Sequence, residues 1–148
     1  MTGPTSACVQ ALDPNAQPAA SLRVLLADDS QVLRYVTCRL LATWGIVPVL
    51  ARNGAEAVAL AAEQDFDLIL MDIQMPIMDG LTATLRIRNQ ERVGCSGRVP
   101  VVAYTSCDST WDKEALSRSG MDAQLQKPCN AAAMENCLNR LCPRKFPE

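Results

Sequence analysis

Three carboxylates in the sequence follow directly on short apolar runs. Asp72 follows the run 68–71, and Asp28 and Asp29 follow the run 23–27. A short apolar run bounded by turn residues is typical of a strand that is buried on both faces of a parallel sheet. The carboxyl ends of parallel strands share one edge, where open α/β sheets hold their ligands. We therefore expect the three acids to lie together.

Further polar side chains follow the later strands. Thr105 and Ser106 come after the stretch 99–104, and Lys127 comes after 123–126. Neighbouring carboxylates raise one another's pKa, and one lysine leaves about two of the three negative charges uncompensated. Oxygen ligands without His or Cys favour Mg²⁺. A divalent ion, an ammonium, a hydroxyl and a carboxylate nucleophile together predict a site for a phosphoryl group.

Each of these residues also has a purely structural interpretation. Asp72 suits the cap of a loop, and Asp28 and Asp29 suit the start of a helix. Thr105 suits a turn, and Lys127 suits a solvated surface. Their shared position after successive strands favours the functional interpretation, because independent structural roles would not select one edge.

The segments between these residues predict a regular alternation. Strands are expected at 23–27, 47–51, 68–71, 99–104 and 123–126. Helices are expected after the cap Ser30, after Asn53-Gly54, and over 81–92, 109–119 and 131–141. Pro48 suits an edge strand. Strands that alternate with helices need crossover connections, which predicts an α/β fold with a parallel sheet covered on both faces.

Helical periodicity predicts which side chains each helix buries. The first helix, which Gly45 ends, is expected to bury Val32, Val36, Leu40 and Trp44, with Leu33 and Leu41 beside them. The second is expected to bury Ala55, Val58, Ala59 and Ala62. The third places Leu81, Leu85 and Arg88 at helical spacing, with a solvated basic face. The fourth is expected to open with a Ser109-x-x-Asp112 capping pattern and close at Gly120, and the last to bury Met134, Cys137, Leu138 and Leu141.

Composition places the chain among single globular domains. It has 148 residues, an apolar fraction of 49%, and 14 basic against 16 acidic residues. No basic block predicts direct nucleic-acid contact, and no apolar run is long enough to cross a bilayer. Residues 1–21 are rich in Ala, Pro, Ser and Thr and lack a signal-peptide pattern, so we expect a flexible tail or linker and a cytoplasmic location.

Cysteine and histidine usage excludes several classes of protein. The seven cysteines form no Cys-x-x-Cys pair and there is no histidine, so we expect free thiols rather than a zinc site or disulfides. Without histidine this stretch cannot itself be a histidine kinase, a histidine phosphocarrier or a Ser-His or Cys-His enzyme. It also lacks the Gly-x-x-x-x-Gly-Lys-Ser/Thr motif of P-loop NTPases.

Four motifs together resemble the response-regulator receiver domains of two-component signalling. They are Leu26-Ala27-Asp28-Asp29-Ser30, Met71-Asp72-Ile73-Gln74-Met75-Pro76-Ile77-Met78-Asp79-Gly80, Ala103-Tyr104-Thr105-Ser106 and Leu125-Gln126-Lys127-Pro128. They occur in the order and at the spacing of that family, over Leu22 to about Cys142. The resemblance implies a three-layer sandwich with five helices and a five-stranded parallel sheet in the flavodoxin-like order 2-1-3-4-5. Residues 143–148 would be a C-terminal tail.

The resemblance also implies a role for each matching residue. Asp72 would be the phosphoacceptor, and Asp29, Asp72 and the backbone carbonyl of Gln74 would bind Mg²⁺, with Asp28 acting mostly through water. Lys127 and Thr105 would bind the phosphoryl group.

Residues next to these positions would influence access to the site and the rate at which the aspartyl phosphate hydrolyses. Ser106 would leave the pocket open, and Gln74 and Cys107 would influence how fast the aspartyl phosphate hydrolyses. The bond from Lys127 to Pro128 would be cis.

One residue departs from the family pattern. Receivers usually carry Tyr or Phe three residues before the lysine, and its inward swing accompanies the threonine shift. Gln124 stands there in this chain. Tyr104 adjoins Thr105, but alternation along a strand directs it to the other face. We therefore expect the phosphorylation chemistry to be intact and the output switch to be weak or different.

Several alternatives remain open. The residue types of the motif around Asp72 favour the receiver of a hybrid sensor histidine kinase. This segment would then be cytoplasmic even if its parent protein is membrane-bound. A stand-alone response regulator and a degenerate, binding-only receiver are the alternatives, and weak homodimerisation is left open.

The expected partner is a histidine kinase or a histidine phosphotransfer protein. An aspartyl-phosphate phosphatase of the haloacid-dehalogenase type would need an acid where Gln74 stands. The isolated chain is not expected to be an enzyme, although it would assist its own phosphorylation and dephosphorylation. Its output would be protein contact or onward relay, because few residues follow the last helix.

Overall fold

The computed structural model describes residues 22–94, 97–106, 112–127 and 129–143. Within them strands and helices alternate as predicted. The strands are β1 (Val24–Ala27), β2 (Val49–Ala51), β3 (Leu68–Met71), β4 (Val101–Ser106) and β5 (Ala123–Lys127). The helices are α2 (Gln31–Ala42), α3 (Gly54–Glu63), α4 (Gly80–Gly94), α5 (Lys113–Arg118) and α6 (Ala131–Leu141). None of these helices is long and apolar enough to cross a membrane.

The five strands form one parallel sheet in the order β2-β1-β3-β4-β5, so the predicted fold class and strand order are confirmed. Every residue of the central strands β1 and β3 is buried, as expected of apolar runs that are covered on both faces. Strand β2 lies at an edge and begins at Val49, directly after Pro48, which has no N–H to offer a ladder.

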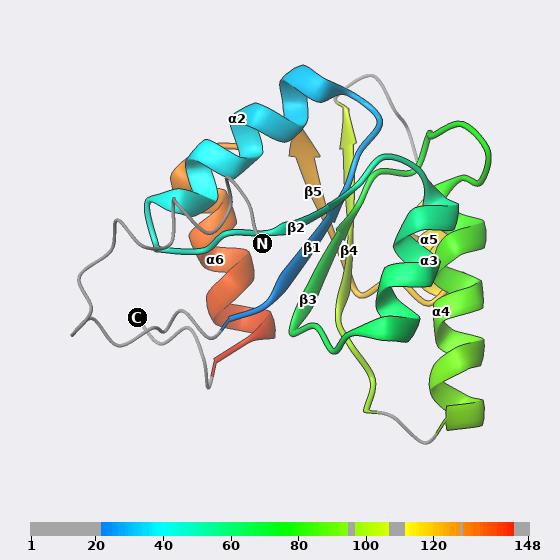
Figure 1. Cartoon of the computed structure of the whole chain (residues 1–148). Helices are drawn as coiled ribbons and strands as arrows, with labels where there is room; N and C mark the ends of the chain where they lie inside the picture. The colour runs from blue at the N-terminus through cyan, green and yellow to red at the C-terminus, as the bar shows by residue number, and fades with distance from the viewer. Residues whose placement is uncertain (1–21, 95–96, 107–111, 128, 144–148) are drawn as a thin grey trace.

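Helices cover both faces of the sheet (Figure 1). Helices α2 and α6 lie on one side, and α3, α4 and α5 lie on the other. Alternation along each strand divides the core accordingly. Leu26, Leu70 and Tyr104 belong to the apolar cluster on the α2 and α6 side, whereas Leu25 and Ile69 belong to the cluster on the opposite side.

The buried face of α2 differs from the predicted one. Leu41 is buried as predicted and Thr37 is buried without having been predicted, whereas Val32 and Val36 are exposed. A spacing of four residues advances more than one turn of a helix, so the predicted stripe drifts by about 40° at each step. Only its C-terminal end, with Trp44, packs against the core.

Two other helices also bury residues that were not predicted. In α3 the exposed alanines include Ala59 and Ala62, while Ala57 is buried. A helix with alanine on every side offers no periodic contrast from which its face can be predicted. In α4 Leu85 is exposed, and the buried side is formed by small residues together with Ile87.

Several element boundaries moved by a few residues. Strand β4 includes Thr105 and Ser106, and β5 includes Lys127, because the ladder between the two strands continues to the pair Ser106 and Lys127. Helix α5 begins only at Lys113, capped by Asp112. The predicted cap Ser109 lies outside the described residues. The predicted range of α6 is confirmed.

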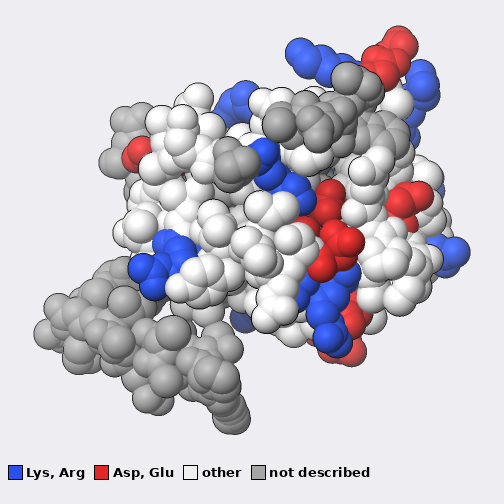
Figure 2. Space-filling view, turned by 90° about the horizontal axis from the view of Figure 1, so that it is seen from above, with Lys and Arg blue, Asp and Glu red and all other residues white. Residues whose placement is uncertain are grey.

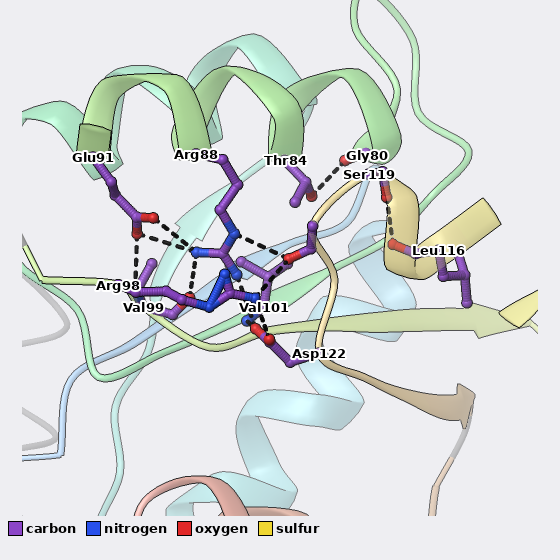
Figure 3. A network of polar contacts seen from close by, with 11 residues as sticks. Gly80, Thr84, Arg88, Glu91, Arg98, Val99, Val101, Leu116, Ser119 and Asp122 are labelled. Carbon is purple, nitrogen blue, oxygen red and sulfur yellow. Dashed lines mark hydrogen bonds and ion pairs between the residues drawn. The ribbon is translucent and has the colours of Figure 1, made fainter. Parts of the chain in front are cut away.

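The basic face predicted to be solvated on α4 contains a half-buried arginine. Arg88 donates to the carbonyl oxygens of Val99 at 2.7 Å and Gly120 at 3.0 Å, and it pairs with Glu91 and Asp122 (Figure 3). These contacts tie α4 to the segments that enter β4 and β5. Arg88 is therefore a structural clamp at the amino-terminal edge of the sheet.

Candidate functional site

The three predicted acids meet at the carboxyl edge of the sheet. Asp28 follows β1 and Asp72 follows β3, and these strands are neighbours in register. Carboxylate oxygens of Asp28, Asp29 and Asp72 lie within 4.8 Å of one another. Asp28 and Asp72 are buried and Asp29 is exposed. Viewed onto this edge, acidic side chains gather near the middle of the face with basic ones beside them (Figure 2).

Lys127 bridges two of these acids. Its Nζ lies 2.9 Å from Oδ2 of Asp28 and 3.2 Å from Oδ2 of Asp72. The lysine side chain is only 4% exposed. A buried charge is tolerated when it is paired and hydrogen-bonded, so the lysine and the two acids form one electrostatic unit.

Asp72 has a perturbed pKa. Burial, together with the nearby Asp28 carboxylate, raises the pKa from an ordinary 3.8 to about 6, against the lowering effect of Lys127. The backbone N–H of Gln74 donates to Oδ1 of Asp72 at 3.3 Å and favours the ionised form. An additional cation beside this carboxylate would favour the ionised form more strongly.

Asp28 serves two partners with its two oxygens. Oδ1 accepts from the backbone N–H of Ser30 at 3.0 Å, while Oδ2 accepts from Lys127. Ser30 is the predicted N-cap of α2, with its hydroxyl accepting from the N–H of Leu33. The structural interpretation of Asp28 as part of a helix start is thus correct for one oxygen, and the other belongs to the site.

The loop after Asp72 folds back tightly against it. Gly80 donates its N–H to the carbonyl of Ile73 at 2.8 Å, and a Cβ at Gly80 would collide with the carbonyl oxygen of Asp72. Nearby, Met78 donates to the carbonyl of Pro76 at 2.7 Å, which closes a γ-turn around a residue with φ of 72°. That residue is Ile77, and positive φ is unusual and strained for a β-branched side chain.

Thr105 offers a hydroxyl that has no hydrogen-bond partner among the described residues. The side chain is 1% exposed. An unpaired buried hydroxyl costs free energy, so such a group in a site is a candidate donor to a ligand. Ser106 follows it at the end of β4, half-buried.

An open hollow of about 600 Å³ reaches the acidic cluster at Asp29. Its lining residues are Asp29, Ile73, Gln74, Met75, Pro76 and Asp79. The oxygens of three carboxylates form a hard donor set without nitrogen or sulfur, which fits Mg²⁺. Gln74 lines the same hollow.

Some predicted residues are not part of this cluster. Gln124 is exposed on β5, where it lines a separate hollow of about 590 Å³ together with Leu116, Met121 and Arg140. Cys107 and Pro128 lie outside the described residues.

Two contacts of the site were missed by sequence reasoning. Arg34 donates to the backbone carbonyl of Asp28 at 2.7 Å. Tyr104 faces away from Thr105 as alternation predicts, yet its ring centroid lies 5.7 Å from Nζ of Lys127. The side chain of a lysine is long enough to contact an aromatic ring on the neighbouring strand. Such a contact cannot be predicted from the pattern of residue types.

A protein-family model described as the response regulator receiver domain matches residues 24–139. Among curated proteins, the chain is 36% identical over 134 residues to hybrid signal transduction histidine kinase G of Dictyostelium discoideum, covering 89% of this chain and 4% of that protein. It is 40% identical over 106 residues to the sensor protein GacS of Pseudomonas syringae, covering 72% of this chain and 12% of that protein. The chain therefore spans only a small part of these relatives.

Two solved structures are similar to this one. The receiver domain of a Saccharomyces cerevisiae response regulator, crystallised with a histidine phosphotransfer signaling protein, superposes with a TM-score of 0.77 at 29% identity, covering 84% of this chain and 91% of that chain. The receiver domain of a Pseudomonas aeruginosa sensor histidine kinase, with magnesium in its active site cleft, gives 0.72 at 35% identity, covering 81% and 96%.

Proposed function

The chain belongs to the response regulator receiver domain family, and we propose that Asp72 is its phosphoacceptor in a His-Asp phosphorelay. One observation carries the proposal: the Asp72 carboxylate lies directly after a buried strand, 3.2 Å from a buried lysine and close to two further acids. A carboxylate held in this way is positioned to attack a phosphoryl group.

The proposed reaction transfers the phosphoryl group from a phosphohistidine of a partner. An Asp72 carboxylate oxygen forms a bond to phosphorus as the bond from phosphorus to the imidazole nitrogen breaks, and the bonding electron pair leaves on the imidazole. Lys127 balances the negative charge of the transferred group. The unpaired hydroxyl of Thr105 donates to a phosphoryl oxygen, and the small Ser106 leaves room for it.

Mg²⁺ is the proposed cofactor. Asp29 and Asp72 would hold it directly, the backbone carbonyl of Gln74 would add a third ligand, and Asp28 would act mostly through water. A bound divalent ion neutralises negative charge on the transferred oxygens. The cluster of carboxylate oxygens and the magnesium-bound relatives support this proposal.

The proposed partner is a histidine phosphotransfer protein or a histidine kinase that docks beside the site on α2. This helix begins directly after the acids and exposes Val32, Tyr35 and Val36. The Ile77 turn at the edge of the site adds another exposed apolar side chain. The yeast relative was crystallised with a phosphotransfer protein, which supports this occupant.

We further propose that residues 22–142 form a receiver of a hybrid sensor histidine kinase. Curated relatives of that kind support this parent over a stand-alone regulator. Residues 1–21 would be a linker and 143–148 a tail. The domain would not be an enzyme by itself, although Gln74 and Cys107 would set how fast its own aspartyl phosphate hydrolyses. The exposed Gln124 supports an output switch that differs from the aromatic one.

The deciding experiment is phosphorylation by acetyl phosphate with Mg²⁺, followed by mass spectrometry of the intact protein. We expect one added phosphoryl group in the wild type and none in Asp72→Asn. Asp65→Asn is the matched control, because Asp65 is an exposed acid that precedes β3, at the edge of the sheet opposite the site. Equal labelling of wild type and Asp72→Asn would overturn the assignment of Asp72, and absence of labelling in the wild type would favour a binding-only receiver.

A further inference from the structure

Tyr104 lies against the phosphoryl-binding lysine from the far side of β4. The residue is 2% exposed and belongs to the apolar cluster under α2 and α6, while its neighbour Thr105 faces the opposite side of the sheet. Nζ of Lys127 lies over the tyrosine ring, 5.7 Å from its centroid. The ring thus reaches the site without lining the hollow that leads to it.

The ring completes the surroundings of the Lys127 ammonium group. An ammonium has three N–H groups, and Asp28 and Asp72 lie within 2.9 and 3.2 Å of it. The face of an aromatic ring carries partial negative charge and attracts a cation within about 6 Å, more strongly where water is excluded. Lys127 is nearly fully buried, so little water competes with the ring.

The phenol hydroxyl fixes where that ring can be. It lies 2.9 Å from the hydroxyl of Thr37, a buried residue of α2, and 3.9 Å from the thiol of Cys129. Burial raises the pKa of Tyr104 far above its ordinary value, so the phenol stays neutral and keeps its hydrogen-bonding proton at physiological pH. Polar contacts at one end and Lys127 above the face hold the ring in a single place.

We propose that Tyr104 is a positioning residue for the phosphorylation of Asp72, and that its ring, anchored by Thr37 of α2, holds the Lys127 ammonium between the acids where the phosphoryl group arrives. This inference rests on the proposed function and deepens it. It gives Tyr104 a role through Lys127, without contact to the phosphoryl group. The competing explanation is that Tyr104 only fills the core.

Three substitutions separate the two explanations. Tyr104→Phe keeps the ring and removes the hydroxyl, and Tyr104→Leu keeps an apolar side chain and removes the ring. Val102→Ala is the matched control, since Val102 is a buried residue of the same strand and the same cluster but is not a neighbour of the ammonium in any described contact. All three variants lose packing or a hydrogen bond, and only Tyr104→Leu loses the ring.

The kinetic measurement is the rate of labelling of the full chain by acetyl phosphate with Mg²⁺. We expect Tyr104→Leu to lower the maximal rate by about 5- to 10-fold, because a ring contact of this kind contributes on the order of one power of ten when desolvated. The half-saturating acetyl phosphate concentration should change by less than about twofold, since the ring acts through the lysine and not on the donor. Tyr104→Phe retains the ring and loses only the anchoring hydrogen bond to Thr37, so its rate should lie between those of the wild type and Tyr104→Leu.

The spectroscopic measurement is the proton NMR shift of the Lys127 side-chain CH₂ next to Nζ. Protons above an aromatic face are shifted upfield, so we expect an upfield signal in the wild type and in Tyr104→Phe, and its loss in Tyr104→Leu. The wild-type signal needs no variant, so an unshifted signal would overturn the role of Tyr104 even if Tyr104→Leu does not fold.

The outcomes distinguish this inference from the proposed function. Failure of the wild type to be labelled would overturn the proposed function, whatever the lysine signal shows. Normal labelling of Tyr104→Leu, an equal loss in Val102→Ala, or an unshifted lysine signal in the wild type would each overturn the role of Tyr104 while leaving Asp72 as the phosphoacceptor.

Discussion

Lys127 and Asp28 form a buried ion pair, with 2.9 Å between Nζ and Oδ2, although they are 99 positions apart in the chain. Asp28 is completely buried and the Lys127 side chain is nearly so. The pair joins the ends of β1 and β5, two strands that are not neighbours in the sheet. It therefore closes the carboxyl edge across β3 and β4.

Removal of the lysine charge should destabilise the fold. Lys127→Met leaves two buried carboxylates without a counter-ion, and we expect the free energy of unfolding in EDTA at pH 7.5 to fall by about 3–5 kcal/mol. Urea denaturation measures this. The loss should shrink near pH 5, where Asp72 takes up a proton. Lys113→Met, at an exposed position on α5, is the control. A loss no larger than that of the control would contradict the paired-charge interpretation.

Replacement of the Asp72 carboxyl should have a stabilising effect that depends on pH. The folded pKa of about 6 lies above the ordinary 3.8, so the folded protein favours neutral Asp72. This contribution is fully present below the unfolded pKa and is lost as the pH rises through about 6. Asparagine at position 72 cannot ionise, so Asp72→Asn keeps this contribution to stability as the pH rises. In EDTA we expect the variant to exceed the wild type by about 1–2 kcal/mol at pH 7.5, after allowance for partial solvent screening, and by much less at pH 4. Equal differences at both pH values would contradict the prediction.

Substitution of Thr105 should separate stability from ligand binding. Thr105→Val removes a buried hydroxyl that has no partner among the described residues, so the free energy of unfolding should stay the same or rise by up to about 1 kcal/mol. Affinity for beryllofluoride with Mg²⁺, measured by calorimetry, should fall by about 5- to 10-fold, equivalent to one lost hydrogen bond.

Thr84→Val is the matched control for this experiment. The Thr84 hydroxyl is also buried, but it donates to the carbonyl of Gly80 at 2.8 Å. Its removal should cost about 1 kcal/mol of stability. Its beryllofluoride affinity should match that of the wild type. If Thr105→Val binds beryllofluoride as well as this control does, Thr105 has no role in phosphoryl binding.

Arg88 should be needed for stability and not for phosphorylation. Arg88→Met removes hydrogen bonds to two carbonyls and leaves Glu91 and Asp122 less compensated, so we expect a loss of about 2–4 kcal/mol in urea denaturation. Labelling by acetyl phosphate should be retained, because the clamp lies at the opposite edge of the sheet. Arg86→Met, exposed on the same helix, should change stability by less than about 0.5 kcal/mol. A large loss of labelling in folded Arg88→Met would show that the two edges are coupled.

The sheet and the acids could be predicted from the sequence, because both follow from local rules. An apolar run such as 68–71 admits few structures other than a buried strand, and the ends of parallel strands must share an edge. This was enough to bring Asp72 and Lys127 together. The helix faces could not be predicted equally well. In α2 the apolar spacing is four residues rather than 3.6, and only the orientation of the helix on the sheet decides that Thr37 is buried and Val32 is exposed.

Contacts that depend on side-chain reach were also beyond prediction. Alternation correctly directs Tyr104 away from Thr105, but it does not indicate that a lysine from the next strand extends over the ring. Likewise, the spacing of basic residues on α4 does not distinguish the exposed Arg86 from Arg88, whose partners come from two distant turns. Such contacts require the three-dimensional arrangement of several elements.

The two oxygens of Asp28 connect the start of α2 to the ammonium of Lys127. Under the proposed function, Lys127 would give up part of its contact with Asp28 when it pairs with a phosphoryl group, and Asp28 is the same carboxylate that accepts from the N-cap of α2. This shared carboxylate would link occupancy of Asp72 to the affinity for a protein bound on α2, and such a linkage is reciprocal. If phosphorylation of Asp72 lowers the affinity of α2 for the donor protein, the dephosphorylated donor dissociates after the transfer. Asp28 alone would then favour transfer in one direction.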